Sequence, residues 1–292
     1  MNAKSIIQLL EYIDPLLCLI TIGALFRAKQ VRAFFSLFLL LSTKVIADSV
    51  ALLIFFLLAR GVDKHVAYPI YFYTYWTAYA LEAILSILVI YSIFKLAMEP
   101  LKGLQSLGLL VFRWAAAISI AVAIGMAFGP HMTSTKFIIN AANQLQRTQS
   151  ILTLCLLLFV CFAIRPMGLS HRSRIFGVSL GLGILSTVEL VSSAWLTNMT
   201  TMYMTFSVVR GFAISMAFGI WAAYFFIPEP QRRMIVLPTT SPFLKWNQVS
   251  LALGHDPGYV VVGSSSPDLF APAELEIMRR AAEKTVPVAA LN

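Results

Sequence analysis

Eight ionisable side chains interrupt long apolar runs of this 292-residue chain. They are Glu11, Asp14, Lys44, Asp48, Glu82, Arg147, Glu189 and Arg210. A charged group at the centre of a bilayer costs about 2.5–3.5 kcal/mol on insertion scales, so such groups face a protein interior or a wet cavity and pair with one another. Five of the eight are acids and three are bases. Either some acids are neutral, therefore, or water and an external cation complete the set.

Aromatic rings precede one of these acids on a single predicted helix face. Tyr68, Phe72, Tyr75, Tyr79 and Glu82 follow the spacing i, i+4, i+7, i+11, i+14. Rings beside a carboxylate suit a small cationic or amphipathic organic ligand through cation–π contact. The alternative is structural, because tyrosine and tryptophan also form belts at membrane–water interfaces.

We take eight residues as candidates for binding a ligand that enters from the outer side. They are Glu82, Tyr75, Tyr79, Arg147, Glu189, Arg210, Lys44 and Asp48. Lys44 and Asp48 are four residues apart on one predicted helix and are expected to pair directly. The two arginines, Arg147 and Arg210, need acidic partners, which Glu82, Glu189 and Asp14 offer. Buried salt bridges with a purely structural role are the alternative for all of these charges.

Motifs for other chemistry are missing from the sequence. It contains no HExxH, GxSxG, Walker or GxGxxG motif, and its four histidines lie outside the apolar runs. The three cysteines are an odd number inside apolar runs, which favours neither a disulfide framework nor a metal site. The sequence therefore predicts no catalytic residue, no metal site and no cofactor.

Composition identifies the environment of the chain. It is 59% hydrophobic and 12% charged, whereas soluble domains carry about 25% charged residues. This is the composition of an integral membrane protein, whose first partner is the lipid bilayer. The net charge of +9 is explained by basic loop residues that set the topology, so no nucleic-acid partner is predicted.

Seven apolar runs are long enough to cross a membrane as helices. They cover residues 6–26, 34–58, 67–95, 107–128, 138–164, 175–196 and 203–227. The fold class is therefore an all-α, seven-helix transmembrane bundle over residues 1–227. Loops after the first, third and fifth runs and the start of the tail hold ten Lys and Arg residues, against four on the other side. The N-terminus is therefore expected outside and the C-terminus in the cytoplasm, which puts all eight ionisable groups between the midplane and the outer surface.

Two segments are expected to depart from straight membrane helices. Asp14-Pro15 predicts a kink or a break near the outer end of the first run. Residues 228–292 form a short cytoplasmic tail, with predicted helices at 242–255 and 272–284 and a strand-like run within 257–270. The tail is interpreted either as an appendage docked on the bundle or as a site for a cytoplasmic protein partner.

The pattern YFYxYW…E and the loop EPLKGLQSLGLLVFRW resemble a group of uncharacterised bacterial seven-span integral membrane proteins. The resemblance implies a seven-span fold in the bacterial inner membrane and carries no activity. The plan is also similar to the sensor modules of seven-span bacterial histidine kinases, whereas the last apolar run lacks the lysine of the retinal-binding rhodopsins. We therefore expect a sensor or receptor-like protein with a polar, aromatic-lined pocket in the outer half of the bundle. An accessory subunit of a membrane complex and a carrier of protons or small solutes are the alternatives.

Overall fold

The computed structural model describes seven long helices. Its described residues are 3–60, 64–127, 134–163, 169–196, 203–230, 236–238, 241–254 and 261–263. The long helices are α1 (Ala3–Arg27), α2 (Phe35–Ala59), α3 (Lys64–Ala97), α4 (Lys102–Ala127), α5 (Ser134–Ala163), α6 (Arg174–Leu196) and α7 (Tyr203–Phe226). The shortest, α6, has 23 residues, and at 1.5 Å per residue it is about 35 Å long. Each helix is therefore long enough for the hydrocarbon core of a bilayer.

Six of the helices in the described part of the chain, α2 to α7, are also apolar enough to cross a membrane. These are the helices of an integral membrane protein. The first helix, α1, falls outside that set, so a seventh crossing and the orientation of the termini stay predictions.

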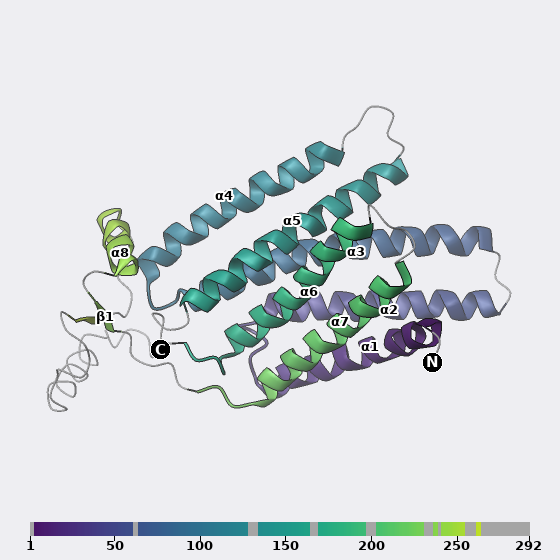
Figure 1. The fold of residues 1–292 in the computed structure, drawn as a ribbon, viewed down its shortest axis with the longest axis horizontal. Helices are drawn as coiled ribbons and strands as arrows, with labels where there is room; N and C mark the ends of the chain where they lie inside the picture. The colour runs from purple at the N-terminus through teal and green to yellow at the C-terminus, as the bar shows by residue number, and fades with distance from the viewer. Residues whose placement is uncertain are drawn as a thin grey trace.

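The helices form a closed ring with one helix outside it. Around the ring, α1 contacts α2, α2 contacts α3, α3 contacts α5, α5 contacts α6, α6 contacts α7, and α7 contacts α1 again. The excluded helix, α4, packs mainly along α5, and it lies at the edge of the bundle in Figure 1. The helix beside α3 in the ring is therefore α5, although α4 follows α3 in the chain.

The buried apolar core occupies one end of the bundle. Its largest fully buried side chains include Leu25, Leu37, Ile93, Val160 and Trp221. Leu25, Ile93, Val160 and Trp221 lie near the C-terminal ends of α1, α3, α5 and α7, and Leu37 lies near the start of α2. These helix ends are at the same end of the bundle, which is the predicted cytoplasmic half. This half of the bundle is therefore held together by aliphatic and aromatic packing.

Glycines on α6 let α7 approach closely within this core. A Cβ on Gly181 would overlap the indole of Trp221, whose Nε1 donates a hydrogen bond to the carbonyl of Val178 at 3.2 Å. A Cβ on Gly177 would likewise overlap the ring of Tyr224. The two helices are therefore held together by large rings on α7 that fill the spaces left by glycines on α6.

Of the kink or break expected at Asp14-Pro15, the break is not found, and a kink stays a prediction. The first helix continues from Ala3 to Arg27 with Pro15 inside it. Asp14 Oδ1 accepts a hydrogen bond from Ser215 Oγ at 2.8 Å, and Thr21 Oγ1 donates to the carbonyl of Phe218 at 3.2 Å. Contacts with α7 on both sides of the proline therefore accompany an unbroken helix.

The described part of the tail is small. It consists of α8 (Pro242–Ala252) and two three-residue strands, β1 (Val236–Pro238) and β2 (Val261–Gly263), which pair in parallel with Val236 opposite Val261. The helix predicted over 242–255 is therefore present, and β2 lies in the predicted strand-like run, whereas β1 was not predicted. The helix predicted over 272–284 lies outside the described residues.

Candidate functional site

Glu189 on α6 contacts polar side chains from two other helices. Its Oε2 accepts hydrogen bonds from Gln146 Nε2 and, at 3.2 Å, from Ser150 Oγ, both on α5. Its Oε1 lies 3.8 Å from Nη2 of Arg210 on α7. The side chain of Glu189 is 20% exposed and that of Arg210 is 41% exposed. Three helices therefore meet at one partly buried ion pair.

Arg210 also meets a ladder of stacked tyrosines on α3. Its guanidinium carbon lies 5.9 Å from the ring centroid of Tyr79. Tyr79 stacks on Tyr75 with centroids 6.2 Å apart, and Tyr75 stacks on Tyr71 at 6.1 Å. The ladder follows the i, i+4 row of the helix, so it includes Tyr71, which the sequence analysis did not select. The expected members Tyr68 and Phe72 instead contact each other, with centroids 6.4 Å apart.

Two adjoining cavities surround these groups. The first, of about 110 Å³, lies between α2 and α3 and is lined by Lys44, Asp48, Tyr71, Tyr75, Tyr79, Glu82 and Arg210, among others. The second, of about 70 Å³, reaches α5, α6 and α7, where Gln146, Gln149, Glu189 and Trp221 line it. Lys44, Glu82 and Arg210 line both cavities. They therefore form a charged partition between the two spaces.

The charges around the cavities do not balance. Lys44 and Arg210 supply two positive charges, and three carboxylates, Asp48, Glu82 and Glu189, face them. In the described part of the chain, ion pairs within 4.0 Å join Arg210 to Glu189 and Arg174 to Glu229, and Lys44 is in neither. The direct pair expected between Lys44 and Asp48 is therefore not formed. With every group ionised the site has a net charge of about −1, which one monovalent cation or one proton neutralises.

Seven of the eight candidate residues line these cavities, and Arg147 does not. The inward face of α5 carries Gln146, Gln149 and Ser150, and the first two of these line the second cavity. Arg147 follows Gln146 by one position, which rotates it about 100° around the helix and leaves it exposed. The spacing of Gln146, Gln149 and Ser150 is the sequence signal that identifies the inward face.

Asp14, a further ionisable group of the apolar runs, is not among the residues that line the cavities. Asp14 is hydrogen-bonded by Ser215, as described above, and the side chain of Glu11 lies outside the described residues. Arg113, which the sequence analysis did not include, is exposed on α4 and donates a hydrogen bond from Nη2 to the hydroxyl of Tyr91 at 2.8 Å. Arg113 is therefore anchored to α3 at the edge of the bundle.

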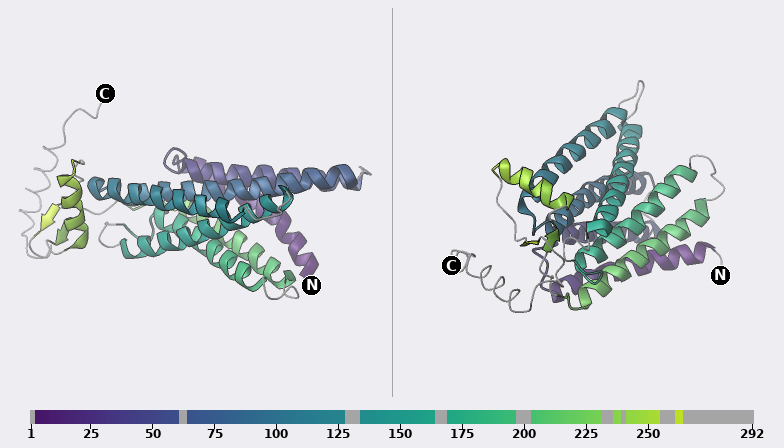
Figure 2. Two further views of the ribbon diagram at one scale, coloured as in Figure 1. Left: turned by 90° about the horizontal axis from the view of Figure 1, so that it is seen from above. Right: turned by 60° about the vertical axis from the view of Figure 1, so that its left-hand side comes forward.

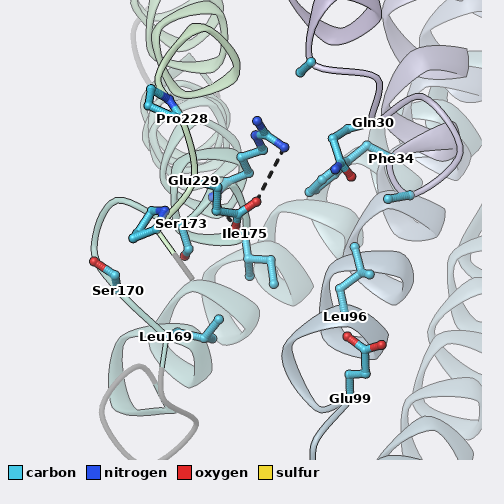
Figure 3. A pocket seen from close by; sticks show the side chains of 14 residues that line it. Gln30, Phe34, Leu96, Glu99, Leu169, Ser170, Ser173, Ile175, Pro228 and Glu229 are labelled. Atoms are coloured by element: carbon cyan, nitrogen blue, oxygen red, sulfur yellow. Dashed lines mark hydrogen bonds and ion pairs between the residues drawn. The ribbon is translucent and has the colours of Figure 1, made fainter. Parts of the chain in front are cut away.

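A larger cavity, of about 580 Å³, lies at the opposite end of the bundle (Figure 3). It is walled by the α1–α2 turn, the end of α3, the start of α6 and the residues after α7. Nη1 of Arg174, the first residue of α6, lies 3.6 Å from Glu229 Oε2, and its backbone N–H donates to Glu229 Oε1 at 3.3 Å. The carboxylate of Glu229 therefore occupies the positive N-terminal end of α6.

In the predicted orientation this larger cavity is the inner cavity and the first two are the outer cavities. The apolar core separates the inner cavity from the outer ones. On α2, Phe34 just before the helix lines the inner cavity and Leu41 lines the second outer cavity. Leu37 lies between them and is fully buried. On α6, Val178 is fully buried in the same way between Ile175 and Leu182. The outer and inner cavities are therefore not connected through these helices.

Within the described residues, no group of three or more His, Cys, Asp or Glu side chains is arranged to hold a metal ion. No family model, no curated protein and no solved structure matches the chain. The function is therefore inferred from the arrangement of its own residues.

Proposed function

We propose that the protein is a seven-span sensor or receptor-like protein of the bacterial inner membrane. Its N-terminus lies outside, and it binds a small cationic or amphipathic ligand in the outer half of the bundle. The observation that carries the proposal is the convergence of Glu82, Glu189 and Arg210, from three helices, on two adjoining cavities beside stacked tyrosines. Such groups are costly at membrane depth, which marks them as functional.

Charge and ring geometry favour a cation as the ligand. The site has one more acid than base, and the face of Tyr79 already holds one cation, the guanidinium of Arg210. A ligand cation entering the first cavity is attracted to Glu82 and competes with Arg210 for the face of Tyr79. Binding therefore weakens the contact of α7 with α3.

The sealed inner half favours a sensor over a carrier. A carrier needs a path for its solute to the other side, and Leu37 and Val178 fill the region between the outer and inner cavities. A sensor needs only a shift of helices.

We infer that a relative movement of α6 and α7 carries the signal. An ion pair joins these two chain segments at two levels, Glu189–Arg210 on the predicted outer side and Arg174–Glu229 on the predicted inner side. The tail that follows Glu229 passes the change to a cytoplasmic protein partner.

One observation favours a second candidate, an accessory subunit of a membrane complex. Arg147 is exposed on α5 at a depth where lipid is a poor neighbour for a guanidinium. A neighbouring subunit with an acidic side chain at this depth would cover it. Stoichiometric co-purification of such a subunit, lost in the Arg147→Ala variant, would favour this candidate over the sensor.

The test is native mass spectrometry of the protein released from the mildest detergent that keeps it folded. Wild type is compared with Glu82→Gln and with Glu99→Gln, which removes a carboxylate that lines only the inner cavity. We expect a small bound mass on wild type and on Glu99→Gln that Glu82→Gln lacks. An identical set of masses on all three proteins would contradict the proposed site. Solute flux in proteoliposomes that Glu82→Gln abolishes would replace the sensor with a carrier.

A further inference from the structure

The short helix α8 lies across the direction of the bundle. In Figure 1 and in the left view of Figure 2 the long helices run horizontally and α8 stands upright beside the end where α4 begins. It packs against α4 and touches β1. If the long helices cross a bilayer, an element at right angles to their end lies parallel to the membrane plane.

Two opposite faces of α8 carry apolar side chains. Leu244 is 5% exposed and Ser241, just before the helix, is 8% exposed, so this face is the one that packs on the bundle. Trp246, Val249 and Leu253 are 58%, 49% and 64% exposed. At 100° per residue they lie about 140–200° from Leu244. Leu253 continues the helical turn, since its N–H donates to the carbonyl of Val249 at 3.2 Å.

The exposed face therefore has no cover in the described part of the chain, and we propose that it is covered by lipid. The structure assigns α8 to the boundary between headgroups and acyl chains of the leaflet at this end of the bundle. Trp246, Val249 and Leu253 lie toward the acyl chains. The proposal concerns the described tail and is independent of the ligand site.

Three observations select lipid as the occupant. The helix that α8 packs against, α4, crosses the membrane and carries the exposed apolar side chains Leu110, Val111 and Trp114. Tryptophan is the side chain that prefers the membrane interface, because its ring is apolar and its indole N–H is polar. Lys245, exposed one position before Trp246, lies at the side of this face, where its ammonium reaches lipid phosphates.

The test measures the surroundings of single nitroxide labels on the full chain in phosphatidylcholine–phosphatidylglycerol nanodiscs. Cys18, Cys155 and Cys161 are first replaced by alanine, and retained thermal unfolding shows that this background folds. One label is attached at Val249→Cys, a second on the same face at Leu253→Cys, and a control at Gln248→Cys, which is exposed on another side of α8. Collision rates with oxygen, which concentrates in lipid, and with a water-soluble nickel chelate are compared.

We expect the oxygen-to-nickel collision ratio at positions 249 and 253 to exceed that at 248 by about tenfold. Equal ratios at the three positions, with ready access for nickel, would show that the face lies in water and would overturn the proposal. Low collision rates with both reagents at 249 and 253 would show that protein covers the face, and would also overturn it. The second label keeps the test decisive if Val249→Cys fails to fold.

Discussion

Arg210 is the side chain that joins the parts of the outer site. It pairs with Glu189 on one side, lies over the ring of Tyr79 on the other, and lines both cavities. Its side chain is 41% exposed in the protein alone, so its ion pair stabilises the fold less than a fully enclosed pair does. A group held by several moderate contacts is suited to exchange partners with a ligand.

A double-mutant cycle measures the pair directly. We expect Arg210→Gln and Glu189→Gln each to lower the free energy of unfolding, and the double variant to lose about 1–2 kcal/mol less than the sum, because either change alone already removes the attraction. Denaturant unfolding in mixed micelles gives the three values. Arg147→Gln is the matched control and should change stability little, since its side chain is exposed and in no ion pair of the described residues. Strict additivity would show that the pair contributes nothing.

Replacing Tyr79 separates ring chemistry from the hydroxyl. We expect Tyr79→Leu to weaken binding of tetramethylammonium about fivefold, because a cation–π contact is worth about 1 kcal/mol. Tyr79→Phe keeps the ring and should retain the affinity. Titration calorimetry in nanodiscs supplies the dissociation constants. Tyr73→Leu, on an exposed side of α3 away from the cavities, is the control. A loss of affinity in the phenylalanine variant as large as in the leucine variant would argue against a cation–π role.

At the scale of elements, the α6–α7 pair is the unit that spans the molecule from site to site. Arg174 begins α6 and Glu189 lies about four turns further along it. Each has an oppositely charged partner on α7 or in the residues after it. Between these two residues, the glycines of α6 receive the rings of Trp221 and Tyr224. Close packing of this kind transmits a displacement, because it leaves few voids to absorb it.

Filling the Gly181 position tests this packing. We expect Gly181→Ala to destabilise the protein by about 1–3 kcal/mol, since the new methyl group overlaps the indole of Trp221 and the core cannot expand freely. Gly219→Ala on α7 is the matched control, because nothing lies within 4 Å of its added Cβ. It should be neutral or stabilising by up to about 1 kcal/mol through helix propensity. Equal loss of thermal stability in the two variants would contradict close α6–α7 packing.

Hydrogen exchange tests the Arg174–Glu229 ion pair separately from the outer site. We expect Glu229→Gln to speed amide hydrogen exchange at the start of α6 by about fivefold, because the Arg174 N–H loses a charged acceptor worth about 1 kcal/mol. Mass-spectrometric exchange of the peptide that contains Arg174 measures this. Glu99→Gln removes a carboxylate from the same cavity and leaves the Arg174–Glu229 pair in place. The same acceleration in both variants would point to a general loosening of the cavity instead.

At the scale of the whole molecule, polar and apolar regions are divided along the bundle axis. The two cavities lined by Lys44, Glu82 and Arg210 lie toward one end, and the aliphatic core separates them from the larger cavity with the Arg174–Glu229 pair at the other end. The two ends therefore hold separate polar sites. The proposal also depends on which end faces outward.

Labelling with a membrane-impermeant maleimide tests the orientation. We expect Arg60→Cys, at the end of α2 near the outer cavities, to react in intact cells, and Ser170→Cys, beside the inner cavity, to react only after the membrane is permeabilised. The physical reason is the excess of Lys and Arg in the loops on the Ser170 side. The protein without added cysteines is the control. The reverse pattern would place the cavities with their charges on the cytoplasmic side.

The helices could be located from the sequence because hydropathy and length are local properties. The seven predicted runs overlap α1 to α7 with ends that differ by a few residues, and the membrane character of α2 to α7 follows from the same residues. The membrane crossing of α1 stays a prediction. The selection of buried charges also rested on a local rule, the cost of a charge in lipid. Five of the eight charges that it chose line the cavities: Lys44, Asp48, Glu82, Glu189 and Arg210. Whether they bind a ligand stays a prediction.

Only the tertiary structure showed which helices are neighbours and which side chains of each helix face the cavities, because these depend on helix packing and on rotation about each helix axis. Arg147 and Gln146 are neighbours in the chain, and a turn of about 100° sends one outward and the other to Glu189. Lys44 and Asp48 have the spacing of a pair and form none within 4.0 Å, because that spacing makes contact possible without fixing the rotamers. The inner cavity needs four segments far apart in sequence to meet at one end. No local sequence pattern predicts that these four segments lie together, because their contact results from the packing of the whole helix ring.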